Sequence, residues 1–369
     1  MKCAGCGAES AAVSSALGIC AACITGGSEA HGATIAEAHR KSREEFGLPC
    51  APPRSAGGLT CEYCARGCRL ADGETGFCGV RVRSGGRILH PAGADCAYML
   101  CYYDPLPTNC VASWVCAGCS PAGYPEYSRA GGTERGYKNL AAFYAGCNFN
   151  CLFCQNWSCR RLGDGHAAMT PGEVASLADS RTSCICFFGG DPGPHVEHSI
   201  RSAEAALERA AVRPFRVCWE TNGCMTVAYL EKISRIALES GGCVKVDIKA
   251  FSPELHNALC GIGNAQVLRN VELLASVAAE RRTPPLFVAS TLLVPGYVTP
   301  SEVKKIAAFI ASLDPDTPYS LLAFSPQFYM DDLPATSRRH MEESVAAARE
   351  AGLKNINAGN PFLLSSVRY

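Results

Sequence analysis

Short apolar runs alternate with helix-forming stretches over the second half of the chain. The runs span residues 140–145, 184–188, 215–220, 244–248, 286–294, 319–324 and 355–359. Apolar runs of this length, without polar alternation, are typical of strands that are buried on both faces of a parallel sheet. Six or seven such strands with helices between them predict an α/β fold, a partial or full TIM-like (β/α) barrel of parallel strands.

Several sequences mark where the intervening helices begin and end. Residues 170–173 (TPGE) and 299–302 (TPSE) each combine an N-cap hydroxyl, a proline at the first helical position and the glutamate of a capping box. Ser252-Pro253 is a third start of this type, and a helix over 338–351 is expected to end at Gly352.

Polar, glycine and cysteine residues gather where the predicted strands end. Because the carboxyl ends of parallel strands meet at one edge of a barrel, these residues predict a single site at the barrel mouth. They are Gly146-Cys147, Gly189-Gly190-Asp191, Glu220-Thr221-Asn222, Asp247 with Lys249, Pro295-Gly296 and Ser325-Pro326.

Cysteine dominates the composition, with 24 of 369 residues, 18 of them between Cys3 and Cys159. The N-terminus lacks the apolar segment of a secretory signal, and no run of 18 apolar residues occurs, so we expect a cytoplasmic protein with no membrane partner. In a reducing compartment this cysteine content favours metal ligation over disulfides. The 34 basic and 34 acidic residues balance, which does not indicate nucleic-acid binding.

The distribution of cysteine also predicts the domain organisation. We expect residues 1–30 to form a zinc-ribbon-like module and residues 31–136 to form a cysteine-rich metal-binding region. Residues 137–369 then form the barrel.

The motif that indicates the chemistry directly follows the first barrel strand. Cys147, Cys151 and Cys154 have the spacing C-x3-C-x2-C in GCNFNCLFCQNW. Three thiolates on one loop can ligate three irons of a [4Fe–4S] cluster and leave the fourth iron open. The alternatives are buried thiols or a zinc site, for which Cys159 is the nearest fourth ligand.

This motif, with Phe153 between the last two cysteines, resembles that of the radical S-adenosylmethionine (SAM) superfamily. The segments GGDP, ETNG, DIK and TLLVPG, at 189–192, 220–223, 247–249 and 291–296, resemble those of the pyruvate formate-lyase activating enzyme group. The preceding CEYCARGCRLADGETGFCGVR and the tail after residue 323 resemble its AmmeMemoRadiSam-type branch. The resemblance covers about residues 61–364.

The resemblance implies that a reduced [4Fe–4S] cluster cleaves SAM to methionine and a 5′-deoxyadenosyl radical, which abstracts hydrogen from a substrate. It also implies an oxidoreductase that works anaerobically with a reduced flavodoxin or ferredoxin-like electron donor. The chain departs from the formate-lyase activase at Asp191, Ser290 and Ser325, where that enzyme has glutamate, arginine and histidine. The implied cofactor-binding residues are Gly189, Gly190, Asp191, Glu220, Asn222, Asp247, Lys249 and Ser325.

Three further cysteine groups precede the barrel. Cys3, Cys6, Cys20 and Cys23 have the C-x2-C-x13-C-x2-C spacing of a small zinc ribbon, in which iron is the alternative to zinc. For the second group, Cys61, Cys64, Cys68 and Cys78, zinc and an auxiliary iron–sulfur cluster fit equally well. The third group, Cys110, Cys116 and Cys119 with Cys96 or Cys101, forms either an auxiliary [4Fe–4S] site or free buried thiols.

Other notable residues are ascribed mainly to the core. Cys184, Cys186, Cys218 and Cys243 lie in apolar strand runs and are expected to pack as small hydrophobic residues, as are Phe187, Phe188 and Trp219. His195 and His198 follow GGDP and either contact substrate or adenine or lie in a solvated loop. Glu220 and Asp247 are a candidate carboxylate pair for a cation or the ribose.

Three functions follow from these patterns. The first is a radical SAM enzyme that acts on a protein, such as a glycyl-radical-enzyme activase. The second is the same chemistry on a small metabolite, or another peptide or RNA modification. The third is a non-catalytic, metal-bound scaffold or adaptor, against which the intact cysteine triad counts.

Overall fold

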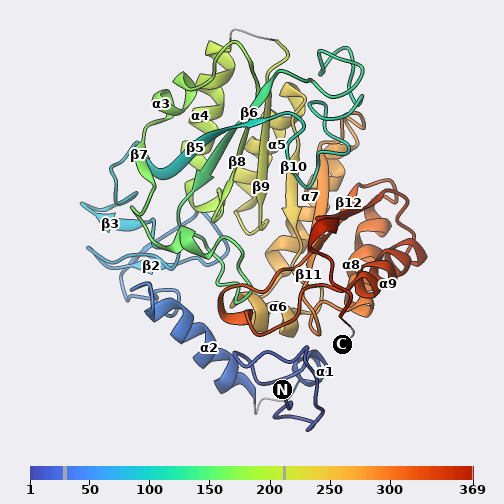
Figure 1. The fold of residues 1–369 in the computed structure, drawn as a ribbon. Helices are drawn as coiled ribbons and strands as arrows, with labels where there is room; N and C mark the ends of the chain where they lie inside the picture. The colour runs from blue at the N-terminus through green and yellow to red at the C-terminus, as the bar shows by residue number, and fades with distance from the viewer. Residues whose placement is uncertain (28–30, 211–212, 368) are drawn as a thin grey trace.

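One nine-stranded sheet organises the chain. The structure, a computed structural model, describes residues 1–27, 31–210, 213–367 and 369. The strand order is β13-β12-β11-β10-β9-β8-β6-β5-β7 (Figure 1), and within the described residues no pairing joins β13 to β7. The sheet is therefore an open, partial TIM-like arrangement, and the predicted α/β class is confirmed. Its parallel strands are β6 (Lys138–Tyr144), β8 (Thr182–Gly189), β9 (Arg216–Thr221), β10 (Val244–Asp247), β11 (Phe287–Leu293), β12 (Tyr319–Ala323) and β13 (Ile356–Gly359).

Two antiparallel strands, which the sequence pattern did not predict, extend this sheet. They are β5 (Ala97–Pro105), paired with β6 from Met99–Tyr144 to Pro105–Lys138, and β7 (Ala167–Met169), paired with β5. Strand β5 precedes residue 137 but shares its backbone hydrogen bonds with β6. The sheet therefore crosses the expected boundary at residues 136–137, and that boundary does not separate two sheets.

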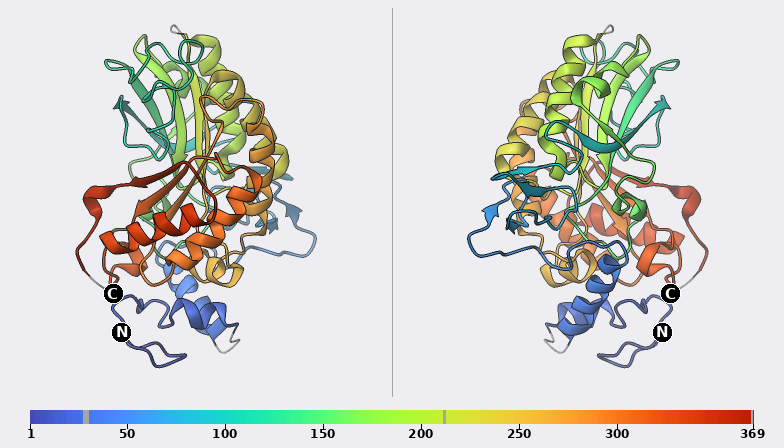
Figure 2. Two further views of the ribbon diagram at one scale, coloured as in Figure 1. Left: turned by 90° about the vertical axis from the view of Figure 1, so that its right-hand side faces the viewer. Right: turned by 90° about the vertical axis from the view of Figure 1, so that its left-hand side faces the viewer.

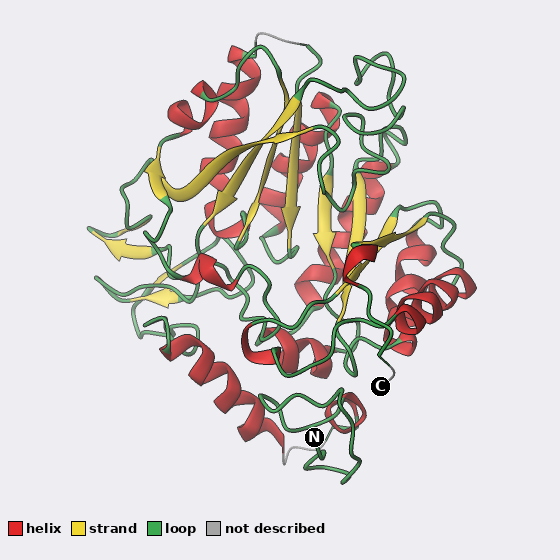
Figure 3. Ribbon diagram, in the orientation of Figure 1, coloured by secondary structure: helices red, strands yellow, loops and turns green. Residues whose placement is uncertain are grey.

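Most of the helices that connect the parallel strands cover one face of the sheet (Figures 2 and 3). Helix α3 begins with the predicted capping box, in which Thr170 and Glu173 bond to each other's backbone. Helix α8 also begins as predicted, but Glu302 instead accepts hydrogen bonds from the backbone of Phe251 and Ser252. These helices are α3 (Pro171–Ser176), α4 (Val196–Arg209), α5 (Val227–Ser240), α6 (Pro253–Cys260), α7 (Ala265–Ala278), α8 (Pro300–Leu313) and α9 (Arg338–Glu350), with 3-10 turns at Trp157–Arg160, Gly193–His195, Phe328–Met330 and Pro361–Leu363.

Alternate residues of the central strands point to opposite faces of the sheet. Ile185 and Phe187 of β8 and Val217 and Trp219 of β9 are fully buried members of the main apolar core. Because side chains alternate along a strand, the residues between them face the other way, into the concave side of the sheet. That concave face carries the polar and thiol groups described below.

The N-terminal segment packs below the carboxyl ends of the strands (Figure 1). The Tyr297 hydroxyl accepts a hydrogen bond from the Ser14 backbone N–H (3.1 Å) and donates one to the Ile19 carbonyl (3.0 Å). The Ser14 hydroxyl donates to Asp332 over 2.9 Å. The elements of this region are α1 (Ala21–Thr25), α2 (Gly32–Glu44) and the two-stranded pairs β1 (Leu59–Thr60) with β2 (Arg69–Leu70) and β3 (Val82–Ser84) with β4 (Arg87–Leu89). Each helix in the described part of the chain is too short or too polar to cross a membrane.

Candidate metal and cofactor site

The cysteine loop leaves the carboxyl end of β6 and lines a cavity of about 180 Å³. Cys147, Cys151 and Cys154 all contribute to the wall of this cavity. The loop is held against the end of α6, because the backbone N–H groups of Asn150 and Leu152 donate to the carbonyls of Cys260 and Leu259 (2.9 and 3.0 Å). The structure therefore brings the three thiols of the predicted triad to one space.

Burial favours the protonated form of two of these thiols. It raises the pKa of Cys147 and of Cys154 above the ordinary value. The thiol of Cys260 lies 3.6 Å from that of Cys151, and this hydrogen bond lowers the pKa of Cys151. Since metals bind the thiolate, loading of such a site releases protons.

A set of buried polar contacts fixes the cysteine loop. Asn150 donates to His39 (2.8 Å) and to Ser42 (2.9 Å), both on α2. Arg160 donates to the Asn150 side chain (2.6 Å) and to the Cys151 carbonyl (3.2 Å), and it also lines the cavity. The Arg160 guanidinium is therefore a buried cation beside the triad. These contacts could not be predicted from the sequence, because the residues that form them lie far apart along the chain.

Asp191 is the buried carboxylate of this site. It accepts hydrogen bonds from the backbone N–H groups of Gly193 and Asn222, each over 2.7 Å, and from the Thr221 hydroxyl over 3.0 Å. Burial outweighs these bonds and raises the pKa of Asp191 to about 6. Much of its accepting capacity is used within the chain, so Asp191 orders the turn after β9 as well as lining the cavity.

Gly189 and Gly190 allow a close backbone approach, but to the chain itself. A Cβ on Gly190 would lie 1.9 Å from the Gly146 carbonyl oxygen, and one on Gly189 would lie 2.5 Å from the Tyr144 nitrogen. Gly189 also has a φ of +121°, which side-chain-bearing residues rarely adopt. The two glycines therefore seat the end of β8 against the start of the cysteine loop.

Charged groups at the next two strand ends complete the wall. Glu220 lies 3.3 Å from the Lys245 ammonium, and Asp247 contacts Lys249. Burial would lower the pKa of Lys249, but the Asp247 carboxylate outweighs it and the pKa is raised. The Asn222 amide lies 2.6 Å from the Asn148 oxygen and 3.8 Å from the Cys147 sulfur.

Some predicted mouth residues do not line the cavity. Ser325 is absent from its wall, to which the neighbouring strands contribute Leu292 and Leu322. A Cβ on Gly296 would lie 2.0 Å from the Ala12 carbonyl, so this strand end packs against the N-terminal segment. Of the predicted mouth residues, those that line this cavity come from the ends of β6, β8, β9 and β10.

The two histidines after GGDP are neither solvated nor in the cavity wall. His195 is fully buried, bonds the Ala145 carbonyl over 2.7 Å and stacks on Tyr144. His198 lies between the Tyr144 hydroxyl and the Met169 carbonyl, each at 2.9 Å. Both side chains therefore pack behind β6, and neither predicted role agrees with this position.

Residues 142–310 match the model of the radical SAM superfamily, a range that runs from the end of β6 through the cysteine loop into α8. The chain contains a radical SAM domain. An uncharacterized protein of Methanocaldococcus jannaschii is 25% identical over 310 residues, 82% of this chain and 81% of that protein. A second protein of that organism, named "Putative glycyl-radical enzyme activating enzyme", is 23% identical over 58% of this chain and 76% of its own length.

Part of the chain is also similar to solved structures. A domain of pyruvate-formate lyase-activating enzyme from Bacteroides vulgatus is matched with a TM-score of 0.38 and 20% identity, over 47% of this chain and 98% of that one. SuiB of Streptococcus suis bound to S-adenosylmethionine is matched with a TM-score of 0.43 and 13% identity, over 60% of this chain and 49% of that one.

Outside the radical SAM domain, the first cysteine quartet is assembled for a metal. The sulfurs of Cys3, Cys6, Cys20 and Cys23 all lie within 4.8 Å of one another. The backbone N–H of Cys20 donates to the Cys3 sulfur and lowers the pKa of Cys3 to about 6. Four thiols at this separation are the donor set of a tetrahedral structural site.

The second quartet is more deeply buried and less tightly gathered. Cys61, Cys64, Cys68 and Cys78 are all buried, and burial raises the pKa of Cys64 and of Cys78. Among the described residues they do not form a group with all sulfurs within 4.8 Å.

Proposed function

We propose that this protein is a radical SAM enzyme in which Cys147, Cys151 and Cys154 ligate a [4Fe–4S] cluster that binds SAM. The observation that carries the proposal is the convergence of these three thiols and the polar ends of β8, β9 and β10 on one cavity. When bound, the cluster supplies the electron that cleaves SAM and generates the radical that abstracts hydrogen.

The donor set and the cavity fit this cofactor pair. None of the three thiols is in a disulfide, and soft thiolates are the ligands that iron–sulfur clusters use. Arg160 places a buried positive charge beside the triad, which offsets the negative charge of thiolates. The chain therefore provides both the ligands and a compensating charge.

The remaining wall residues would position the cofactor. The amide of Asn222 and the Asp247–Lys249 pair present a donor, an acceptor and a cation to the cavity, which suits the carboxylate, amino and hydroxyl groups of SAM. Phe149, Phe153, Leu292 and Leu322 supply apolar wall and limit the access of water.

The test is anaerobic formation of 5′-deoxyadenosine by protein reconstituted with iron and sulfide, then reduced and mixed with SAM. Cys154→Ala should abolish the product. Cys101→Ala, which removes a thiol of β5 that lines neither this cavity nor its neighbour, should retain it. Product that survives Cys154→Ala, or no product from fully iron-loaded protein, would reject the proposal.

For the substrate, we propose a protein glycine, as in a glycyl-radical-enzyme activase. The support is the relative named as such an activating enzyme, and the electron donor would be a reduced flavodoxin or ferredoxin-like protein. The test is an electron paramagnetic resonance (EPR) spectrum of a glycyl-radical enzyme from the same genome after incubation with the loaded protein. A glycyl signal that requires Cys154 is expected. Stimulation of 5′-deoxyadenosine only by the low-mass fraction of a cell extract would favour a metabolite instead.

We further propose that the segment 1–30 is a separate metal-bound module, with zinc rather than iron in its quartet. The close gathering of its sulfurs supports a single ion. All 24 cysteines are free thiols, which supports a reducing, oxygen-poor setting.

A further inference from the structure

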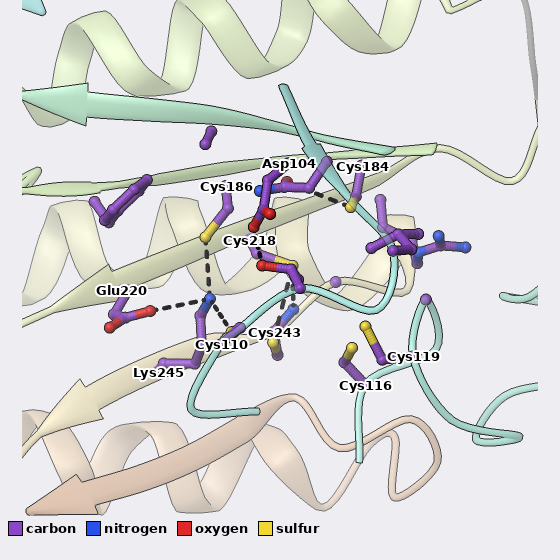
Figure 4. A pocket seen from close by; sticks show the side chains of 18 of the residues that line it. Asp104, Cys110, Cys116, Cys119, Cys184, Cys186, Cys218, Glu220, Cys243 and Lys245 are labelled. Carbon is purple, nitrogen blue, oxygen red and sulfur yellow. Dashed lines mark hydrogen bonds and ion pairs between the residues drawn. The ribbon is translucent and has the colours of Figure 1, made fainter. Parts of the chain in front are cut away.

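A second cavity, of about 200 Å³, lies on the concave face of the sheet beside the first (Figure 4). The two cavities share the wall residues Asn156, Phe188 and Glu220. Seven cysteines line the second cavity, namely Cys110, Cys116, Cys119, Cys184, Cys186, Cys218 and Cys243.

Strand alternation explains how Cys184, Cys186 and Cys218 reach the cavity, and Cys243 directly precedes β10. Cys184 and Cys186 lie two residues apart on β8, so they share one face of the sheet. Cys218 pairs with Cys186 across β8 and β9, and its sulfur lies 3.8 Å from that of Cys243. These residues were expected to pack as small hydrophobic core residues. Cys218 and Cys243 do belong to a small apolar cluster, and all four also line the cavity.

The other three thiols arrive on the loop between β5 and β6. Cys110, Cys116 and Cys119 enter the cavity from the side opposite the strands (Figure 4). Cys96 and Cys101, the expected fourth ligands of this group, do not line the cavity. The loop and the strand cysteines therefore form one set, although more than 60 residues separate Cys119 from Cys184 along the chain.

A buried cation lies among these sulfurs. The Lys245 ammonium is 3.1 Å from the Cys110 sulfur, 3.0 Å from the Cys186 sulfur and 3.3 Å from the Glu220 carboxylate. The Lys245 side chain is 2% exposed, so little water compensates its charge. A buried ammonium requires anionic partners. Glu220 supplies one, and thiolates that ligate a cluster would supply more.

We propose that this cavity binds a second iron–sulfur cluster, held between the 110–119 loop on one side and Cys218 of β9 and Cys243, just before β10, on the other. Seven thiols exceed the four that close a single tetrahedral zinc site, and the cavity exceeds the roughly 30 Å³ of one water molecule. Thiolate-ligated clusters carry negative charge, which Lys245 offsets. The shared wall would set this cluster next to the proposed SAM cavity.

The experiment uses the full chain with Cys147, Cys151 and Cys154 all changed to Ala, which removes the first cluster. Iron and acid-labile sulfide per chain are measured after anaerobic reconstitution, with EPR spectra of the reduced protein. Cys116→Ala/Cys119→Ala and Cys218→Ala/Cys243→Ala are each added to this background. Both pairs should lose the same iron, the same sulfide and the same EPR signal, because one cluster needs both sides of the cavity.

The control is Cys101→Ala in the same background, which should lose none of these. Circular dichroism of each variant before reconstitution confirms that it is folded. Unchanged iron in both folded double variants, or loss of zinc without loss of iron and sulfide, would overturn the proposal. Because SAM cleavage is not measured, failure here leaves the proposed function of the first cavity intact.

Discussion

The Arg66 side chain donates a hydrogen bond over 2.8 Å to the backbone carbonyl of Asn148, the residue that follows the first cysteine of the triad. Its guanidinium also donates to the Gly261 carbonyl over 2.6 Å and lies on the ring of Phe77. Arg66 stands between Cys64 and Cys68 of the second quartet. The cysteine-rich region therefore supports the loop that carries the candidate cluster ligands.

Arg66→Ala should destabilise the cysteine loop and reduce cluster loading. The substitution leaves two buried carbonyls without donors, and bonds from a charged donor to such groups contribute roughly 3 kcal/mol together. We expect a lower free energy of unfolding and less iron per chain after reconstitution. Arg87→Ala, at an exposed position of β4, is the matched control and should change neither measurement.

The free energy of unfolding should depend on pH because the carboxylate of Asp191 is buried. Its pKa is raised from 3.8 to about 6, so the folded state holds the proton more tightly than the unfolded state. The stabilisation from this group is complete below pH 4 and is lost as the pH rises through 6. At 1.36 kcal/mol per unit, the loss is about 3 kcal/mol.

Asp191→Asn should reduce the fall in the free energy of unfolding between pH 4 and 7. The measurement is chemical denaturation of metal-free protein at intervals over this pH range. The control is Asp179→Asn, because the pKa of Asp179 is lowered to about 2 by its ion pair with Lys138. That control should leave the slope between pH 4 and 7 unchanged. If the free energy of unfolding of Asp191→Asn fell with pH as steeply as that of the unaltered protein, Asp191 would not be the group responsible.

Six of the seven parallel strands were predictable because they are largely buried and therefore form apolar runs, whereas β13 lies at the edge of the sheet and is only half-buried. Strand β5 was not, since one of its faces is exposed and Leu100, Tyr102 and Tyr103 are among the exposed large apolar residues. Helix α2 was missed because its segment is polar and its N-cap, His31, makes no side-chain hydrogen bond.

The triad was predictable from spacing because its three cysteines lie on one loop. The seven-thiol cavity was not, because its wall combines a loop with strands that come much later in the sequence. Spacing showed only Cys110, Cys116 and Cys119, and the strand cysteines are indistinguishable from core residues until the sheet is assembled. No local sequence pattern indicated that Arg66 and Arg160 would contact the cysteine loop.

Gly190→Ala should be strongly destabilising. The added Cβ would lie 1.9 Å from the Gly146 carbonyl oxygen and 3.1 Å from the Cys159 sulfur, so backbone must move. We expect a loss of about 3 kcal/mol in the free energy of unfolding, the upper range for overpacking. Gly172→Ala in α3 meets nothing within 4 Å and should stabilise by about 0.5 kcal/mol. Equal effects of the two substitutions would contradict this account.

Removal of metal from the first quartet should loosen the N-terminal segment from the barrel. Cys3 and Cys20 bracket Ser14 and Ile19, whose contacts with Tyr297 dock the segment, so a metal bound by the quartet would hold both sides of the docked turn. A chelator, or Cys3→Ser, should release one metal ion per chain and lower the melting temperature by roughly 5 °C. Cys50→Ser, at an exposed free thiol, should do neither. Metal analysis also identifies the ion, and retention of the metal by Cys3→Ser would show that this quartet is not its ligand set.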